Sequence, residues 1–267
     1  MKTRNILFTI MLLLSGVTAS AQCPMQNKAF KSGEFLAYNL YFNWKMVWIK
    51  VGTASLSTVQ SSYKGQSAYR SSLITRGNKR ADGVFLMRDT LLTYSTLNLE
   101  PLYYRKGARE GDRYTVDQVF YSYPNGRVHA RQSRKHTDGH VDSQQHYYTN
   151  CVYDMLNIFQ RARSFNASNW QKGHRVDFSI VDGNGLTPAY IQYTGKYYIK
   201  GDNGKKYRCL RLTYMEKEKN KYKQIACFYV TDDTNHIPVR LDMNLRFGSA
   251  KAYVTGMRGS LTPVTTY

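Results

Sequence analysis

The sequence has 267 residues, with 38 lysines and arginines against 18 aspartates and glutamates, which gives a formal net charge of +20 at pH 7. A positive excess of this size repels itself and is typical of a chain that meets a negatively charged partner or surface. Beyond the N-terminal segment no window is apolar over the about 20 residues that a bilayer-spanning helix needs, so we expect no transmembrane segment in the mature chain.

The first residues have the pattern of a secretory signal peptide. A basic start is followed by an apolar run over residues 6–14 and by small residues at 19–21, where a signal peptidase would cut. We expect residues 1–21 to be removed and residues 22–267 to form a single β-rich exported domain in the periplasm. A membrane anchor through a lipid on Cys23 is the alternative. Export excludes nucleic acid as the partner of the positive charge.

Alternating apolar residues predict β-strands along most of the chain. Residues 34–42 alternate with a period of two, and residues 51–54 and 68–75 continue the pattern. Residues 81–87 suit a short helical turn. Asn-Gly turns between β-rich runs are strong hairpin signals, because both turn residues need positive φ. The predicted hairpins are 114–133 around Asn125-Gly126, 190–214 around residues 202–204, and 206–231 around residues 216–221, followed by strands at 239–245 and 250–254.

One helix is predicted near residues 150–164. Apolar residues recur at helical spacing from Val152 to Ala162, and Thr149 or Asn150 can cap the N-terminus. The apolar stripe must be buried, and the concave side of a curled sheet offers the place. We therefore expect a mainly β fold, with one large curled antiparallel sheet, an open or half barrel, packed around this helix. A two-sheet β-sandwich is the alternative.

Two cysteines lie on the arms of the hairpin around residues 216–221. If its turn is centred on Glu218, Cys209 and Cys227 face each other within disulfide range, and an oxidising compartment permits the bond. A shifted turn would instead leave two buried free thiols. Both interpretations stay open. Cys151 has no CxxC partner, and we interpret it as a core thiol.

Catalytic and metal-binding motifs are missing from the sequence: it contains no GxSxG, no HExxH and no CxxC. His136, His140 and His146 lie in a polar segment that also contains glycine, which favours a solvated loop over a metal site. We expect no metal, no cofactor and no enzyme activity. An enzyme on glycans, with two carboxylates converging in a cleft, is the third hypothesis.

Aromatic and basic residues adjoin each other on several predicted strands, and the chain has 23 tyrosines. Aromatic rings stack on sugars, and apolar half-barrels hold acyl chains. Ordinary sheet packing explains the same residues equally well. Our candidate ligand-binding residues are Trp44, Trp48, Arg88, Asp89, Tyr103, Tyr104 and Arg105.

Several short segments carry a family resemblance, among them residues 30–34, 207–210 and 248–252. In these segments the chain resembles the domain-of-unknown-function 3108 family of exported bacterial proteins. The resemblance implies a periplasmic β-rich domain and brings no activity, ligand or catalytic residue.

Together, these features predict a non-catalytic periplasmic or envelope-associated protein that binds an apolar or anionic envelope component, a lipid or an acidic glycan. The alternative is a structural or interaction protein that docks an envelope protein through its sheet edge or its basic face.

Overall fold

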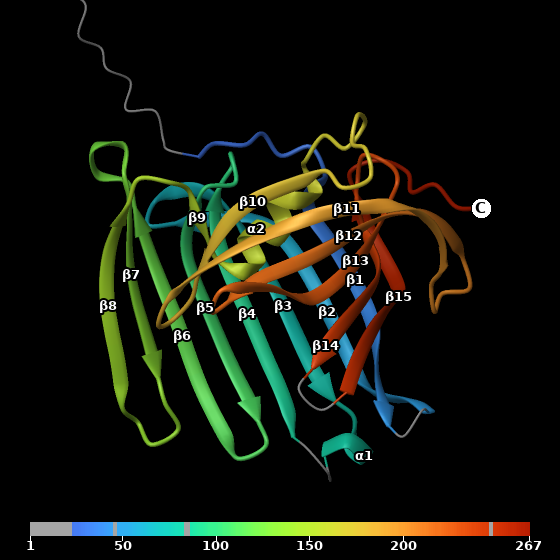
Figure 1. Cartoon of the computed structure of the whole chain (residues 1–267), viewed down its shortest axis with the longest axis horizontal. Coiled ribbons are helices and arrows are strands. Elements are labelled where there is room, and N and C mark those ends of the chain that lie inside the picture. Colours follow the sequence, from blue (N-terminus) through green and yellow to red (C-terminus); the bar gives the residue numbers. More distant parts are fainter. Residues whose placement is uncertain (1–22, 45–46, 83–85, 246–247) are drawn as a thin grey trace, which may run out of the picture.

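The structure is a computed structural model that describes residues 23–44, 47–82, 86–245 and 248–267. In these ranges the chain forms one 15-stranded sheet that curls around a helix (Figure 1). The predicted fold class is therefore confirmed. The alternative of a two-sheet sandwich is wrong, because every strand in the described ranges belongs to the same hydrogen-bonded sheet. The predicted signal peptide, residues 1–21, lies outside the described residues.

The first half of the sheet is a meander in which each strand pairs antiparallel with the next. The Asn125-Gly126 turn has the predicted positive φ angles, 52° and 71°. The elements are β1 (Phe30–Trp44), β2 (Val47–Tyr63), β3 (Gln66–Gly77), α1 (Lys79–Asp82), β4 (Met87–Thr96), β5 (Pro101–Glu110), β6 (Arg113–Ser122), the 3-10 turn η1 (Pro124–Gly126), β7 (Val128–Lys135) and β8 (Val141–Tyr148).

The second half begins with a very short strand and the helix, and then returns as a second meander. Its last strand pairs with the first strand of the chain, which joins the two meanders into one sheet. The elements are β9 (Val152–Tyr153), α2 (Met155–Arg163), β10 (Arg175–Val181), β11 (Leu186–Lys200), β12 (Lys206–Glu218), β13 (Lys221–Thr231), β14 (Pro238–Leu245) and β15 (Gly248–Ser260).

Helix α2 begins later than the predicted caps Thr149 and Asn150 allow. Residues 152–153 are taken by β9, which pairs in parallel with β10, so the helix cannot start before them. Asp154 is the actual cap: its Oδ1 accepts a hydrogen bond of 2.8 Å from the backbone N–H of Asn157. This bond satisfies one of the free N–H groups of the first helical turn.

The two sides of α2 contact the two halves of the sheet. One side is apolar, and Ile158 and Phe159 face Leu212 and Phe228 of the second meander. The other side is polar and hydrogen-bonds to the first meander, as when Gln160 Nε2 donates to Thr58 Oγ1 at 2.6 Å. The helix therefore fills the concave side of the curled sheet, as its apolar stripe predicted.

The cysteine pairing differs from the predicted one. A disulfide joins Cys23 to Cys151, with Cα atoms 5.9 Å apart, while Cys209 and Cys227 are buried free thiols. The candidate disulfide was wrong because the hairpin is not centred on Glu218: the last pair of its ladder is Glu218 with Lys221. Cys209 consequently faces Thr231, and Cys227 faces Thr213. The interpretation of Cys151 as a free core thiol was also wrong.

The polar segment with His136, His140 and His146 was predicted as a solvated loop, and it is part of the β7–β8 hairpin. The predicted helical turn at residues 81–87 begins earlier, as α1, and residues 83–85 lie outside the described residues. Neither helix in the described ranges has the length and apolarity required to cross a membrane.

Candidate functional site

The apolar cavity between α2 and strands β10–β13 is small. It measures about 40 Å³, whereas small-molecule sites usually occupy roughly 300–1,000 Å³. An acyl chain therefore does not fit this cavity.

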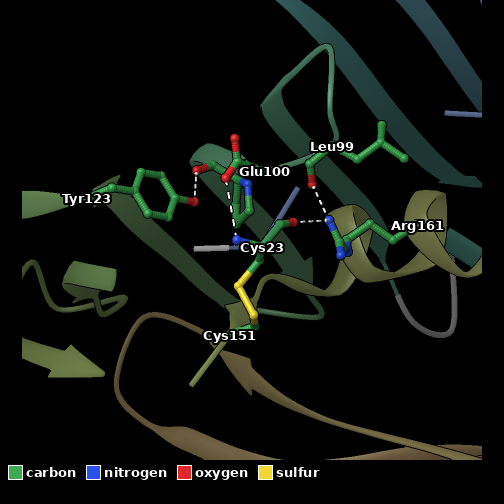
Figure 2. Close-up of a disulfide and its surroundings, with 7 residues drawn as sticks. Cys23, Leu99, Glu100, Tyr123, Cys151 and Arg161 are labelled. Carbon is green, nitrogen blue, oxygen red and sulfur yellow. Dashed lines mark hydrogen bonds between the residues drawn. A yellow bond between two sulfur atoms is a disulfide. The ribbon is translucent and has the colours of Figure 1, made fainter. Parts of the chain in front are cut away.

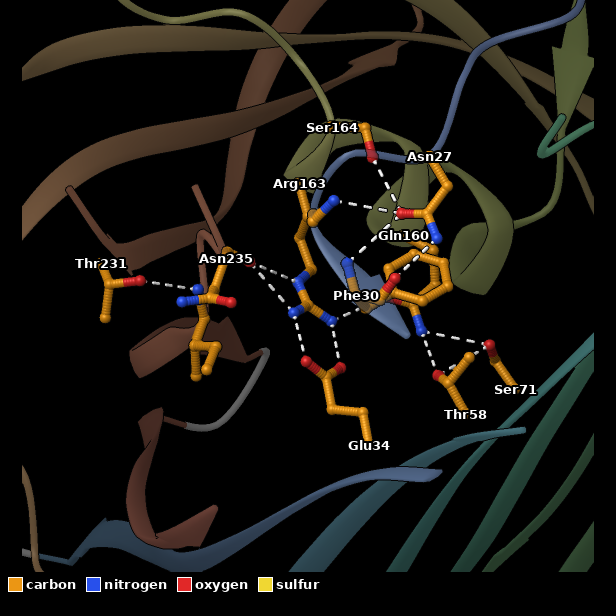
Figure 3. Close-up of polar contacts among 12 residues, drawn as sticks. Asn27, Phe30, Glu34, Thr58, Ser71, Gln160, Arg163, Ser164, Thr231 and Asn235 are labelled. Carbon is orange, nitrogen blue, oxygen red and sulfur yellow. Dashed lines mark hydrogen bonds and ion pairs between the residues drawn. The ribbon is translucent and has the colours of Figure 1, made fainter. Parts of the chain in front are cut away.

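The polar side of α2 is occupied by an ion pair that is fully enclosed (Figure 3). Arg163 binds Glu34 of β1 through two parallel hydrogen bonds of 2.6 and 2.8 Å, and both side chains are 1 % exposed. The guanidinium also donates to the carbonyl oxygen of Asn235 at 3.0 Å. These bonds satisfy both charges internally, so the pair fixes α2 to the sheet and is not open to a ligand.

The disulfide anchors the N-terminal segment beside the same helix (Figure 2). The carbonyl oxygen of Cys23 accepts a hydrogen bond of 2.8 Å from Arg161 Nη1, which also donates to the carbonyl of Leu99 at 3.1 Å. Glu100 Oε1 accepts from the backbone N–H of Cys23 at 3.5 Å. Every partner here is the chain itself, which indicates a structural role.

One ionisable group in the core has an unusual proton affinity. Burial raises the pKa of the Asp154 carboxyl to about 7, although hydrogen bonds from the Asn157 backbone and the Thr93 hydroxyl oppose the change. Thr93 Oγ1 lies 3.0 Å from Asp154 Oδ2. Burial also raises the pKa of Tyr104 and Tyr121, and the Asp154 charge adds to both increases. A carboxyl enclosed in this way serves the helix cap rather than a substrate.

Other acidic side chains pair with arginines. Asp117 accepts two hydrogen bonds from Arg134, at 2.6 and 2.7 Å, and Asp182 lies 3.7 Å from the same guanidinium. In the ranges that the structure describes, no three histidine, cysteine, aspartate or glutamate side chains come together to hold a metal ion.

The opposite face of the second meander carries alternating aromatic and cationic side chains. Leu212 and Phe228 point toward α2, so their strand neighbours Arg211 and Tyr229 project from the other face of the sheet. We call this surface the aromatic–cationic face. Its residues are Tyr41, Trp48, Tyr197, Arg211, Tyr229, Arg240, Lys251 and Tyr253, from β1, β2 and β11–β15.

Cation–π contacts connect the residues of this face. The Arg240 guanidinium lies 5.0 Å from the ring centre of Tyr229 and 5.4 Å from that of Tyr253. Lys251 Nζ lies 4.0 Å from the ring centre of Trp48, which is 37 % exposed. These distances are within the range in which a ring attracts a cation.

Two cations of the face have no carboxylate partner. Arg240 binds Asp242 at 2.5 Å. By contrast, Arg211 and Lys251 form no ion pair with any residue in the described part of the chain, and the Arg211 Nε atom is buried without a hydrogen-bond partner. Trp48 and Tyr197 are the exposed rings of the face, whereas Tyr229 is buried. The face therefore combines two exposed rings with two cations that form no ion pair among the described residues.

The predicted candidate residues do not form one site. Trp48 belongs to the aromatic–cationic face; Trp44 ends β1, but its side chain lies outside the described part of the structure. The neighbours Arg88 and Asp89 point to opposite faces. Arg88 is exposed and binds Asp82 through hydrogen bonds of 2.8 and 2.6 Å.

Asp89 lies on the α2 side of β4, where one of its oxygens is buried without a hydrogen-bond partner. Burial raises the pKa of this carboxyl, and the Lys106 charge opposes the increase. Tyr104 is also on the inner side and is 3 % exposed, so it belongs to the core. Neither residue belongs to the aromatic–cationic face, which lies on the opposite side of the sheet.

Tyr103 and Arg105 project from the outer side of β5. The Tyr103 ring lies 4.9 Å from the ring of Phe120 and 6.0 Å from that of Tyr63. Arg131 lies over the Phe120 ring at 5.6 Å. Lys64 Nζ lies 5.5 Å from the ring centre of Tyr63, so this second aromatic cluster also carries cations. Tyr63 is at the end of β2, whereas Trp48 of the aromatic–cationic face is near the start of the same strand.

Most residues of the aromatic–cationic face were missed in the sequence. Arg211, Tyr229, Arg240 and Tyr253 are each single polar or aromatic residues within an apolar strand. Only the strand register places them side by side: Arg211 faces Tyr229, Tyr229 faces Arg240, and Arg240 faces Tyr253. The local signal was their alternation with apolar neighbours.

Comparisons with known proteins identify a family and a fold. The family model described as "Protein of unknown function (DUF3108)" matches residues 37–255, and no curated protein matches the sequence. Among solved structures, the chain is similar to a β-barrel-like protein of domain of unknown function DUF1849 from Brucella abortus. That match has 9 % identity and a TM-score of 0.54, and covers 90 % of this chain and 99 % of that one. At this identity the likeness concerns the fold alone.

Proposed function

Since the chain belongs to the DUF3108 family, which is described only as of unknown function, we propose a function from its surface chemistry. The protein is an exported, non-catalytic binding protein of the periplasm, and it takes an anionic envelope component, an acidic glycan, on the aromatic–cationic face. The observation that carries the proposal is the row of rings and cations at cation–π distance, in which Arg211 and Lys251 form no ion pair with a carboxylate among the described residues.

The chemistry of the face fits an acidic sugar polymer. Aromatic rings offer flat apolar surface to the C–H side of a sugar ring, and they have a polar edge for its hydroxyl groups. Cations attract the carboxylates of the same polymer, and the excess of lysine and arginine over aspartate and glutamate strengthens that attraction at long range. An extended row across several strands suits a chain-like ligand better than a compact one.

The small interior cavity favours a glycan over a lipid. An acyl chain would need to displace α2, which is fixed by the buried Arg163–Glu34 pair. The disulfide between Cys23 and Cys151 fits an oxidising compartment and supports export. It also uses the Cys23 sulfur that a lipid anchor would require.

The test is a binding measurement on purified residues 22–267. We expect a short oligogalacturonate to bind, and its fully methyl-esterified form, which keeps the rings but has no charge, to bind at least tenfold more weakly. Vesicles with an anionic phospholipid headgroup form a separate arm. Binding to the vesicles but not to the oligomer would show that the ligand is an anionic lipid surface and that the glycan proposal is wrong. Cleavage of the oligomer would contradict the non-catalytic assignment.

Variants locate the binding surface. Trp48→Ala and Lys251→Gln should each weaken oligogalacturonate binding several-fold. The matched controls are Tyr147→Ala and Lys135→Gln, because both change exposed residues at the far edge of the sheet. Equal losses in the controls would indicate attraction by net charge alone and would refute a defined face.

A second candidate function uses the edge of the sheet. Strand β8 is the terminal strand and pairs only with β7 in the described structure. Its residues Val141 and Tyr147 are 50 % and 56 % exposed, and an open edge can accept a strand from another protein. Crosslinking through a photoreactive group at position 147 in intact cells tests this candidate. One dominant crosslinked protein would support it, and a diffuse pattern would contradict it.

A further inference from the structure

A polar hollow adjoins the aromatic–cationic face on strands β1–β3. Its volume is about 410 Å³, which is within the range of small-molecule sites. Asn39 of β1 lines the hollow. Tyr41, which belongs to the aromatic–cationic face, is two residues further along β1 and projects from the same side of the sheet. The outward side chains that line the hollow are Ala37, Asn39, Thr53, Ser55, Ile74 and Arg76, with Thr255 of β15 at one side.

Strand pairing explains why the surface is hollowed here. Asn39 faces Thr53, and Ala37 faces Ser55, so small side chains lie next to each other on adjacent strands. Next to Thr53, Gly52 lets β2 and β3 approach closely, because a Cβ at this position would lie 2.1 Å from the carbonyl oxygen of Arg76. Only glycine permits this close approach.

A positive and a negative side chain are associated with the hollow. Arg76 lines it, is exposed and has no ion-pair partner among the residues that the structure describes. Asp202 lies next to the lining residue Asn39: its Oδ2 accepts hydrogen bonds from Asn39 Nδ2 at 2.8 Å and from the Tyr41 hydroxyl at 2.6 Å. Its Oδ1 makes no hydrogen bond with the described residues and remains available as an acceptor.

This arrangement matches one acidic sugar unit. A guanidinium binds a carboxylate through two parallel hydrogen bonds, and a carboxylate oxygen such as Asp202 Oδ1 accepts from sugar hydroxyl groups. The hydroxyls of Thr53 and Ser55 and the amide of Asn39 add further partners, while Ile74 offers apolar surface to the sugar ring.

We propose that this hollow is the subsite for a single uronic acid unit of the glycan, with its carboxylate on Arg76 and its hydroxyl groups toward Asp202. The inference rests on the proposed function, because the neighbouring units of the polymer lie along the aromatic–cationic face. Arg76 selects the acid group, and the rings hold the polymer whatever its charge.

The experiment compares oligogalacturonate with its methyl ester on variants of residues 22–267. Arg76→Gln should lower the affinity for the acid about tenfold and leave the affinity for the ester nearly unchanged, so the preference for the acid is largely lost. Ser55→Leu should weaken both ligands by filling the hollow. Arg70→Gln is the matched control: it lies on the same face of β3, is also exposed and does not line the hollow. Circular dichroism confirms that each variant is folded.

The outcomes separate the two proposals. If the unmodified protein binds neither ligand, the proposed function is wrong and the subsite has no basis. A second outcome is that the unmodified protein binds the acid and Trp48→Ala weakens this binding, but Arg76→Gln and Arg70→Gln have the same effect. In that case the subsite proposal is wrong, while binding on the aromatic–cationic face is supported. Binding of free galacturonic acid with the affinity of the oligomer would show a monosaccharide site instead of a polymer subsite.

Discussion

Removal of the Cys23–Cys151 disulfide should cost the protein a large part of its stability. The bond closes a loop with a sequence separation of 128 residues. In the chain-entropy treatment, a cross-link of this length lowers the entropy of the unfolded chain by an amount worth about 5 kcal/mol at 25 °C. Since domains of this kind have a total free energy of unfolding of roughly 5–15 kcal/mol, this loss would be a large part of the total.

The assay is urea unfolding of the double variant Cys23→Ser/Cys151→Ser, followed by tryptophan fluorescence. We expect a lower midpoint and a free energy of unfolding reduced by about 3–5 kcal/mol. Reductant should produce the same loss in the unmodified protein and no change in the double variant. Cys209→Ala/Cys227→Ala is the control, because these buried thiols form no cross-link, and its unfolding should remain sensitive to reductant.

Two results would refute the reasoning. A loss below about 1 kcal/mol would mean that the unfolded chain is not constrained by the loop. Peptide mapping without reductant that found Cys209 joined to Cys227 would contradict the pairing itself.

Three further predictions concern the polar core. Glu34→Ala should destabilise the fold by about 3–5 kcal/mol in urea unfolding, because it leaves the buried Arg163 charge unpaired; Asp177→Ala, which breaks the exposed Arg175 pair, should cost less than about 1 kcal/mol. The folded-state pKa of Asp154 is raised to about 7, so the folded protein binds this proton more tightly and stability should fall as pH rises from about 4 to 7. Asp154→Asn keeps a capping side chain, and its melting temperature should no longer decrease over this pH range. An unchanged decrease would show that another group causes the pH dependence. Burial lowers the pKa of His236, whose Nδ1–H donates to the Arg163 carbonyl. The contribution of His236 to stability therefore depends on pH in the opposite direction from that of Asp154. Its stabilisation is complete above its ordinary pKa and is lost as pH falls, and His236→Gln should remove that acid-side loss in the same melts.

The general fold could be predicted because it follows from local patterns. Two-residue alternation identified β1, the Asn-Gly turn identified the β6–β7 hairpin, and the helical stripe identified α2. Strand β8 was not predicted as a strand, since none of its residues is buried and its sequence lacks apolar alternation. The cap at Asp154 was missed because β9 occupies the residues before it, and a two-residue strand has no sequence signal of its own.

Pairings between distant residues could not be predicted. Cys23 and Cys151 lie in different halves of the chain, and only the curled sheet brings them together. The error over Cys209 arose from a small displacement of the hairpin turn, which is enough to change every pair in a ladder. Trp48 was recognised from its residue type, but its neighbour Lys251 was not, because the contact joins β2 to β15 at opposite ends of the chain.

The seam between β1 and β15 has a consequence for how the protein folds. All other strand pairs of the two meanders join neighbours in sequence, so they form without closing long loops. The seam joins Phe30 to Ser260, near the two ends of the described chain, and its closure entropy is the largest in the sheet. We expect it to form last. Until the final strand is synthesised, the edge of β1 stays open, and the incomplete chain is exposed to aggregation through that edge.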